Sequence, residues 1–168
     1  MKPVKLVFFA IVSALYMVAG FSSCKRDKCR AVHCYNLGTC KEGACTCATG
    51  YEGTDCQTVT RLKYIGNWSA TEQLTTGEVT HSYSVSIAEG TDGINSVIIT
   101  NLLNSAALSP ILGTITYGTG LYIPAQQLAG NMVYGNGTFG NGTLTVNMSV
   151  RDLGTGVTNN ATYVLYKL

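Results

Sequence analysis

Residues 142–151 read Gly-Thr-Leu-Thr-Val-Asn-Met-Ser-Val-Arg, and their alternation decides the fold class of most of the chain. Every second side chain of an extended strand points to the same side of its sheet. The apolar residues Leu144, Val146, Met148 and Val150 therefore share one face, and the polar residues between them share the other. One apolar and one polar face are typical of an antiparallel sheet that buries a single side.

The same pattern recurs through the second half of the chain, where no stretch shows the sustained 3.6-residue apolar period of a helix. Short alternating runs bounded by Gly, Asn, Asp and Pro predict strands near 64–74, 79–89, 95–103, 111–117, 120–124, 131–138, 142–151 and 160–167. Turn signals at Gly90-Thr91-Asp92-Gly93 and Gly140-Asn141-Gly142 predict hairpins between successive strands. These short strands suit an all-β fold. We expect a closed eight-stranded antiparallel barrel, with a β-sandwich as the alternative.

Six of the seven cysteines lie close together, and they define a second, smaller unit. They are Cys29, Cys34, Cys40, Cys45, Cys47 and Cys56. A segment this short has almost no core, so cross-links must replace it. Six cysteines allow 15 pairings, and spacing alone selects none of them. In an oxidising compartment they pair with each other rather than hold zinc, so His33 is expected to be an exposed loop residue and no metal is expected.

The run Cys45-x-Cys47-x-x-Gly50-Tyr51-x-Gly53-x-x-Cys56 resembles the second half of an epidermal growth factor-like (EGF-like) module. Asn36, Gly38 and Thr39 before Cys40 also fit that family. The resemblance implies disulfides Cys29–Cys40, Cys34–Cys45 and Cys47–Cys56. Some EGF-like modules bind calcium just before the first cysteine. Here Asp27 is the only acidic residue among three cations, so neither calcium nor any cofactor is expected.

The first 23 residues have the features of an export signal, predicted as a signal helix. Lys2 and Lys5 precede an apolar run of about 15 residues, which is shorter than the roughly 20 needed to span a bilayer. Phe21-Ser22-Ser23-Cys24 then resembles a bacterial lipobox, which implies that Cys24 becomes the lipid-bearing N-terminus. Cys24 is also the one cysteine outside the cluster. The alternative is ordinary signal cleavage with a free or intermolecular Cys24.

These features divide the chain into a signal peptide (1–23), a short linker after the lipidated cysteine (24–28), an EGF-like module (29–56), a linker (57–63) and a barrel (64–168). We expect an exported protein, anchored by lipid in the outer membrane or at the cell surface. The formal net charge is only +2, without the clustered basic face that nucleic acid requires. The membrane, and not nucleic acid, is therefore the expected partner.

Gly66-Asn67-Trp68, on the first expected strand, resembles the Gly-x-Trp motif that opens lipocalins and related calycins. The chain resembles calycin-like lipoprotein domains of Bacteroidetes-type bacteria more than it resembles lipocalins, because those domains also carry a Leu/Ile-x-Ile-Pro-x-Gln segment, here residues 121–126. The resemblance implies that Trp68 plugs the closed end of the barrel and belongs to the core. We expect Pro124 to end a strand. No defined activity follows from this resemblance.

No catalytic constellation emerges, so we expect no enzyme. The barrel segment holds one histidine, His81, and no nucleophile elbow. Its acidic residues (Glu72, Glu78, Glu89, Asp92 and Asp152) mostly fall near expected strand ends or turns, where they would be solvated. A glycosidase pair among them is not specified by any pattern.

Two further residue types leave alternatives open. Tyrosines 64, 83, 117, 122, 134, 163 and 166 suit either a stacking platform for sugars or simply the strand propensity of tyrosine. Asn-x-Ser/Thr sequons begin at residues 67, 136, 141, 147 and 160. They are ordinary strand residues in a bacterial protein and glycan acceptors in a eukaryotic one.

Three functional hypotheses remain. The first is an envelope protein whose barrel binds a small apolar ligand, a carbohydrate or a protein partner, with the EGF-like module as stalk or interaction surface. The second is a structural or adhesive surface protein without a ligand, and the third is a hydrolase. A hollow barrel interior favours the first and an interior filled by large side chains favours the second.

Overall fold

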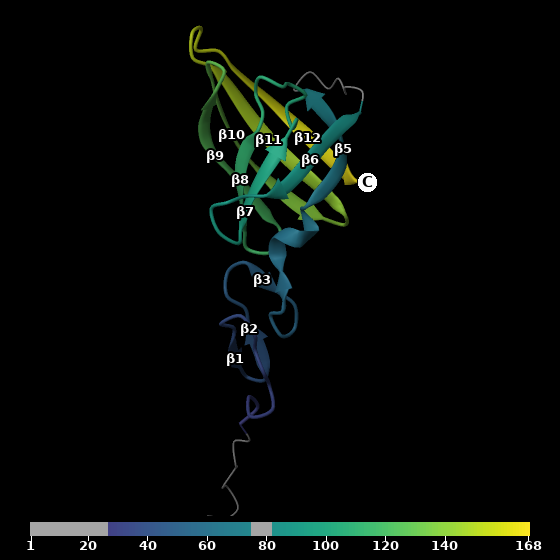
Figure 1. The fold of residues 1–168 in the computed structure, drawn as a ribbon, viewed down its shortest axis with the longest axis vertical. Coiled ribbons are helices and arrows are strands. Elements are labelled where there is room, and N and C mark those ends of the chain that lie inside the picture. The colour runs from purple at the N-terminus through teal and green to yellow at the C-terminus, as the bar shows by residue number, and fades with distance from the viewer. Residues whose placement is uncertain (1–26, 75–81) are drawn as a thin grey trace, which may run out of the picture.

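The computed structural model describes residues 27–74 and 82–168. The signal segment with Cys24, and also Glu78 and His81, lie outside the described residues. The described chain has two parts, a small disulfide-rich module at one end and a larger β-barrel at the other (Figure 1).

The barrel is closed, and each of its strands pairs antiparallel with its neighbours in sequence. Its strands are β5 (Gly66–Leu74), β6 (Tyr83–Glu89), β7 (Ser96–Thr100), β8 (Ile111–Thr116), β9 (Gly120–Leu128), β10 (Asn131–Gly140), β11 (Thr143–Asp152) and β12 (Thr158–Lys167). The last strand, β12, pairs with the first, β5, and this pairing closes the barrel. The all-β fold and the eight strands are confirmed, and the arrangement is a barrel rather than a sandwich. Closure gives every strand of the described barrel a neighbour on both sides, so that none is an edge strand.

The connections between strands lie at two opposite ends of the barrel. The near end, which faces the module, carries residues 90–95, 117–119 and 141–142, and the distal end carries residues 101–110, 129–130 and 153–157. The connection between β10 and β11 consists of two residues with positive φ, Asn141 (52°) and Gly142 (76°). Asn-Gly is the preferred pair for such a turn, as the sequence predicts.

Strand β9 differs from its prediction, because it runs through Pro124 instead of ending there. Its pairing with β8 stops at Tyr122, so the missing N–H of Pro124 interrupts no bond on that side. Beyond this point the Gln126 side chain bridges the two strands. Its Nε2 donates to the carbonyl oxygen of Leu112 (2.9 Å), and its Oε1 accepts from the Leu112 N–H (3.0 Å). The prediction failed because a side-chain amide replaces backbone pairing here.

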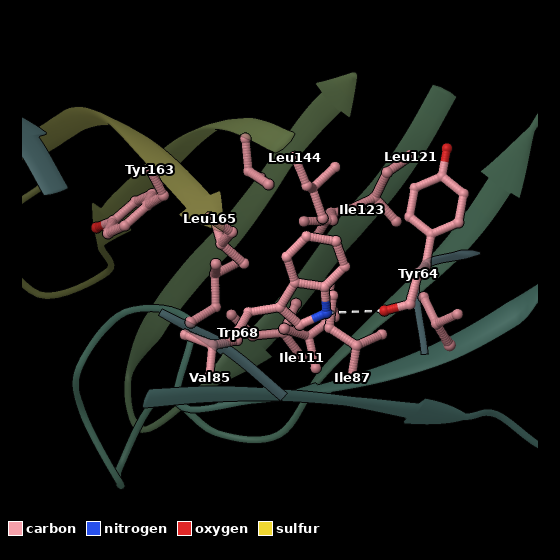
Figure 2. Close-up of a cluster of buried hydrophobic side chains, with 14 of the residues drawn as sticks. Tyr64, Trp68, Val85, Ile87, Ile111, Leu121, Ile123, Leu144, Tyr163 and Leu165 are labelled. Atoms are coloured by element: carbon pink, nitrogen blue, oxygen red, sulfur yellow. Dashed lines mark hydrogen bonds between the residues drawn. The ribbon is translucent and has the colours of Figure 1, made fainter. Parts of the chain in front are cut away.

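Large apolar side chains fill the barrel interior. The largest buried ones include Trp68, Ile87, Ile99, Ile111, Ile123, Leu144 and Leu165, all less than 2% exposed. Figure 2 shows Trp68 among the side chains of Ile87, Ile111, Leu144 and Leu165, which belong to the same cluster. An eight-stranded barrel is just wide enough for its side chains to fill, so this interior is a core.

The disulfide-rich module contains two short hairpins. One pairs β1 (Thr39–Lys41) with β2 (Ala44–Thr46), and the other pairs β3 (Tyr51–Glu52) with β4 (Thr58–Val59). Disulfides join Cys29 to Cys40, Cys34 to Cys45 and Cys47 to Cys56, which are the pairs that the sequence resemblance implies. A 3-10 helix, η2 (Thr60–Lys63), follows β4 directly and leads into β5. The segment 57–63 therefore carries regular structure.

Candidate functional site

The module packs against the near end of the barrel. Gly50 is buried there, and a Cβ atom at this position would lie 2.6 Å from Ile94 Cγ2 and 2.8 Å from Asn95 Oδ1, in the β6–β7 connection. The Gly50 carbonyl accepts from the Thr60 N–H (2.9 Å). Glycine is thus required at residue 50, both for its φ of +97° and for this close approach.

Charged side chains reinforce the same junction. The Arg61 guanidinium donates to the Glu89 carboxylate (2.5 Å) and to the Gly93 carbonyl (3.1 Å), with its side chain only 13% exposed. The Lys63 ammonium lies 2.6 Å from the Glu52 carboxylate. The Arg61 contact joins η2 to β6 of the barrel, and the Lys63 contact joins η2 to β3 of the module. Together they hold the module and the barrel in one orientation.

Three aromatic side chains close the near end of the barrel. Trp68 and Tyr64 are fully buried. The Phe139 ring packs edge-on against Trp68, with 6.3 Å between the two ring centres. The Trp68 indole N–H donates to the Tyr64 carbonyl (2.9 Å; Figure 2). Burial, followed by the charge of nearby Glu52, raises the pKa of Tyr64 to about 12. Trp68 therefore acts as core, and it offers no face to a ligand.

Lys167 completes this closed end, and sequence reasoning missed it. Its ammonium lies 5.5 Å from the centre of the Trp68 ring and donates to the Lys63 carbonyl (3.0 Å). Lys167 is the direct cross-strand partner of Trp68 in the β5–β12 pairing. Only this register, which the sequence does not reveal, places a cation over the indole.

A small polar cluster lies toward the distal end of the interior. The Tyr163 hydroxyl donates to the Glu72 carboxylate (2.9 Å), and the Tyr83 hydroxyl donates to the Leu102 carbonyl (2.8 Å). Burial, with Glu72 as the second influence, raises the pKa of both tyrosines above the ordinary value. Glu72 is thus an exception to the expectation of solvated acids, because β5 turns its side chain inward to a hydrogen-bonded partner.

A depression lies outside the barrel, on the outer face of β5, β10, β11 and β12. We call it the outer-wall depression, and its volume is about 370 Å³. Its polar lining is Gln73, Tyr134, Asn136, Asn147, Ser149, Asn160 and Thr162, and its floor is Gly135, Met148 and Ala161. None of these described lining residues is charged.

Gly135 explains why a barrel wall is hollowed at this place. A Cβ atom there would lie only 2.3 Å from the Asn147 carbonyl oxygen and 2.6 Å from Met148 Sδ. The β9–β10 register also shifts between Val133 and Gly135. Glycine in a strand interior marks a close backbone approach, and a register shift bends the strand. Gly135 therefore allows β10 and β11 to approach closely at the floor of the outer-wall depression.

Two sequons pair reciprocally in the centre of the outer-wall depression. Asn147 lies opposite Thr162 and Ser149 lies opposite Asn160 in the β11–β12 register. Thr162 Oγ1 donates to Asn147 Oδ1 (2.8 Å), and Ser149 Oγ donates to Asn160 Oδ1 (2.6 Å). Each Asn-x-Ser/Thr triplet thus supplies one amide and one hydroxyl to its antiparallel partner. This use of the sequons needs no attached glycan.

Other kinds of site find less support. The described residues contain no group of three or more His, Cys, Asp or Glu side chains that could hold a metal ion. Glu42, Glu52 and Glu89 are paired with basic side chains. Asp152 accepts from the backbone of Thr155, which lowers the pKa of its carboxyl. In residues 27–74 and 82–168, no helix is long and apolar enough to cross a membrane. A scan of the chain against models of known protein families matches none of them.

The structure brings together only part of what the sequence singled out. Of the seven barrel tyrosines, Tyr134 lines the outer-wall depression, whereas Tyr64, Tyr83 and Tyr163 belong to the interior. Tyr122 is 54% exposed and continues the same outer face. The architecture of a disulfide-rich module followed by a closed barrel is consistent with a binding or a structural role.

Proposed function

We propose that this protein is a lipid-anchored protein of the cell envelope whose barrel is a binding domain that takes its ligand on the outer wall. One observation carries the proposal. The outer wall holds a depression of about 370 Å³ lined by seven polar side chains. Ligand sites in proteins are concave, and their polar groups fix the orientation of the ligand. We therefore propose a binding role for the barrel.

In this proposal the disulfide-rich module is an EGF-like stalk. It lies between the proposed anchor at Cys24 and the barrel, and it is fixed to the near end through Gly50 and Arg61. The outer-wall depression lies on the side of the barrel, away from that junction. A stalk fixed in this way holds the depression clear of a membrane surface. The anchor itself is tested by the intact mass of the purified protein, which should show an acyl increment on a chain that begins at Cys24 and no titratable thiol.

The binding role is tested with ligands that co-purify with the native protein, identified by mass spectrometry. The Ser149→Trp substitution places an indole in the outer-wall depression, and Ser86→Trp places the same group on the outer face of β6, outside the depression. Wild type and Ser86→Trp should retain the ligand, and Ser149→Trp should lose it. Equal retention by both variants would show that the ligand binds elsewhere.

A structural or adhesive role is the second candidate, and the filled interior favours it. A barrel with so complete a core, joined firmly to a stalk, serves well as a spacer or as an adhesive surface. This candidate predicts that no small ligand accompanies the purified protein. It also predicts that Ser149→Trp leaves adhesion of cells that display the protein unchanged.

A further inference from the structure

We infer that the outer-wall depression binds an uncharged saccharide. The inference rests on the proposed function, because it names the ligand of that same site. Four amides, two hydroxyls and one phenol line the depression, without any carboxylate, ammonium or guanidinium group. A charged ligand would find no counter-charge there. An apolar ligand would strip these groups of water without replacing their hydrogen bonds, which is costly. The ligand should therefore be neutral and rich in hydrogen-bonding groups, as the lining is.

The reciprocal pairs orient the two central amides toward the ligand. The Thr162 hydroxyl donates its hydrogen bond to Asn147 Oδ1, and the Ser149 hydroxyl donates its hydrogen bond to Asn160 Oδ1. An amide has two N–H donors beside its oxygen, and a hydroxyl that has given its hydrogen still accepts. Each pair therefore presents N–H donors next to an acceptor oxygen. Sugar hydroxyl groups both donate and accept, so adjacent hydroxyls on one ring complement such a pair.

The distance between the two asparagine–hydroxyl pairs suits a ligand that is longer than one pair of adjacent sugar hydroxyls. Asn147 and Ser149 are two residues apart on one strand, so the two pairs lie about 7 Å apart along it. Asn136 and Gln73 extend the row of the first pair on either side, since Asn136 lies opposite Asn147 and Gln73 lies opposite Thr162. The result is a polar array over four strands, which a sugar ring or a short sugar chain can span.

Tyr134 supplies the apolar contact that a sugar requires. It stands in the row of the second pair, opposite Ser149, and 40% of its surface is exposed. Sugar rings carry C–H groups on their faces, and an aromatic ring packs against such a face while its hydroxyl remains wet. Tyr122 lies opposite Asn136 on the neighbouring strand and is 54% exposed. A second exposed ring on the same face favours an oligosaccharide over a single sugar.

A peptide fits this surface less well. Extended peptides bind sheets by adding a strand to an open edge, and the closed barrel offers none. The depression lies on the face of the wall, where backbone N–H and C=O groups are already paired between strands. Recognition must then come from side chains alone, and here these are amides and hydroxyls.

The test uses the full chain and an array of oligosaccharides, with isothermal titration of any that bind. The array contains neutral glucans, mannans, xylans and galactans of four to six units, beside uronate and sulfated chains. Tyr134→Ala should weaken binding by about tenfold, and Tyr134→Phe should restore it. Removing both central amides, with Asn147→Ala and Asn160→Ala, should weaken binding by about tenfold or more. Tyr166→Ala is the matched control, because Tyr166 is an outward tyrosine of β12 that does not line the depression. Melting curves establish that each variant is folded.

Each outcome decides a definite claim. A neutral oligosaccharide that loses affinity with Tyr134→Ala but not with Tyr166→Ala supports the inference. Binding only of acidic chains, lost with Arg151→Ala two residues beyond Ser149, overturns the neutral ligand. A co-purifying peptide or lipid that Ser149→Trp releases, with no oligosaccharide bound, overturns the saccharide but leaves outer-wall binding intact. Absence of every ligand overturns both proposals.

Discussion

The junction between module and barrel gives the sharpest prediction, because the chain contains its own control. Gly50 and Gly53 both lie in the module and both have a φ of +97°. A Cβ atom at residue 50 would lie 2.6 Å from Ile94 Cγ2, whereas at residue 53 the nearest atom is Thr58 Oγ1 at 3.5 Å. Substitution by alanine strains the backbone equally in both cases. Only at residue 50 does it also force the module away from the barrel.

The expected magnitudes follow from these two effects. A side chain in a left-handed conformation costs about 1–2 kcal/mol, and this applies to Gly53→Ala and Gly50→Ala alike. Overpacking of a close contact adds about 1–3 kcal/mol, and this applies to Gly50→Ala alone. We therefore expect the free energy of unfolding of Gly50→Ala to fall below that of Gly53→Ala by about 1–3 kcal/mol.

Urea unfolding followed by the fluorescence of Trp68 measures this difference in the barrel, because Trp68 is the only tryptophan and lies at the near end. Combining Ile94→Ala with Asn95→Ala removes both side-chain atoms that the new Cβ meets, Ile94 Cγ2 and Asn95 Oδ1. In that background the gap between the two alanine variants should shrink to less than about 0.5 kcal/mol, as expected for residues in direct contact. Equal destabilisation by the two variants in the wild-type background would refute the reasoning, because it would mean that the module does not press on the barrel.

Three other regions of the fold give predictions. Trp68→Ala should cost about 3–5 kcal/mol of unfolding free energy, as large aromatic truncations in cores do, and native Trp68 fluorescence should resist quenching by iodide. Efficient quenching with an unchanged melting curve would contradict its burial. The raised pKa of Tyr64, about 12 against an ordinary 10, means that its stabilising effect is fully present below pH 10 and is lost as the pH rises through 12. The decline in unfolding free energy from pH 10 to 12 should therefore be smaller in Tyr64→Phe than in wild type, and an equal decline would exclude this group as a cause. Gln126→Ala should cost about 1–2 kcal/mol and speed hydrogen exchange at the Leu112 amide, whereas unchanged exchange would show that the amide bridge is dispensable.

The sequence predicts the barrel well because its signals are local. Alternation fixes which side chains point inward, and glycine with asparagine marks the turns, so all eight strands were found. Strand β9 was cut short at Pro124 because its continuation depends on Gln126, a side chain that reaches across to a strand distant in sequence. The contacts of Lys167 and Glu72 were not predicted for the same reason, since their partners are set by the register between β12 and β5.

The outer-wall depression shows why a binding surface on a barrel escapes sequence reasoning even when its residues are conspicuous. The triplets at 147–149 and 160–162 look like glycan acceptors when each is read alone. Their role as paired surface residues follows only from the antiparallel pairing of β11 with β12. This pairing places each asparagine beside the hydroxyl of the other triplet. A pair of Asn-x-Ser/Thr triplets on adjacent antiparallel strands is therefore a pattern that sequences can be searched for. It predicts oriented amides on a sheet surface, and a nearby glycine such as Gly135 indicates where that surface is hollowed enough to hold a ligand.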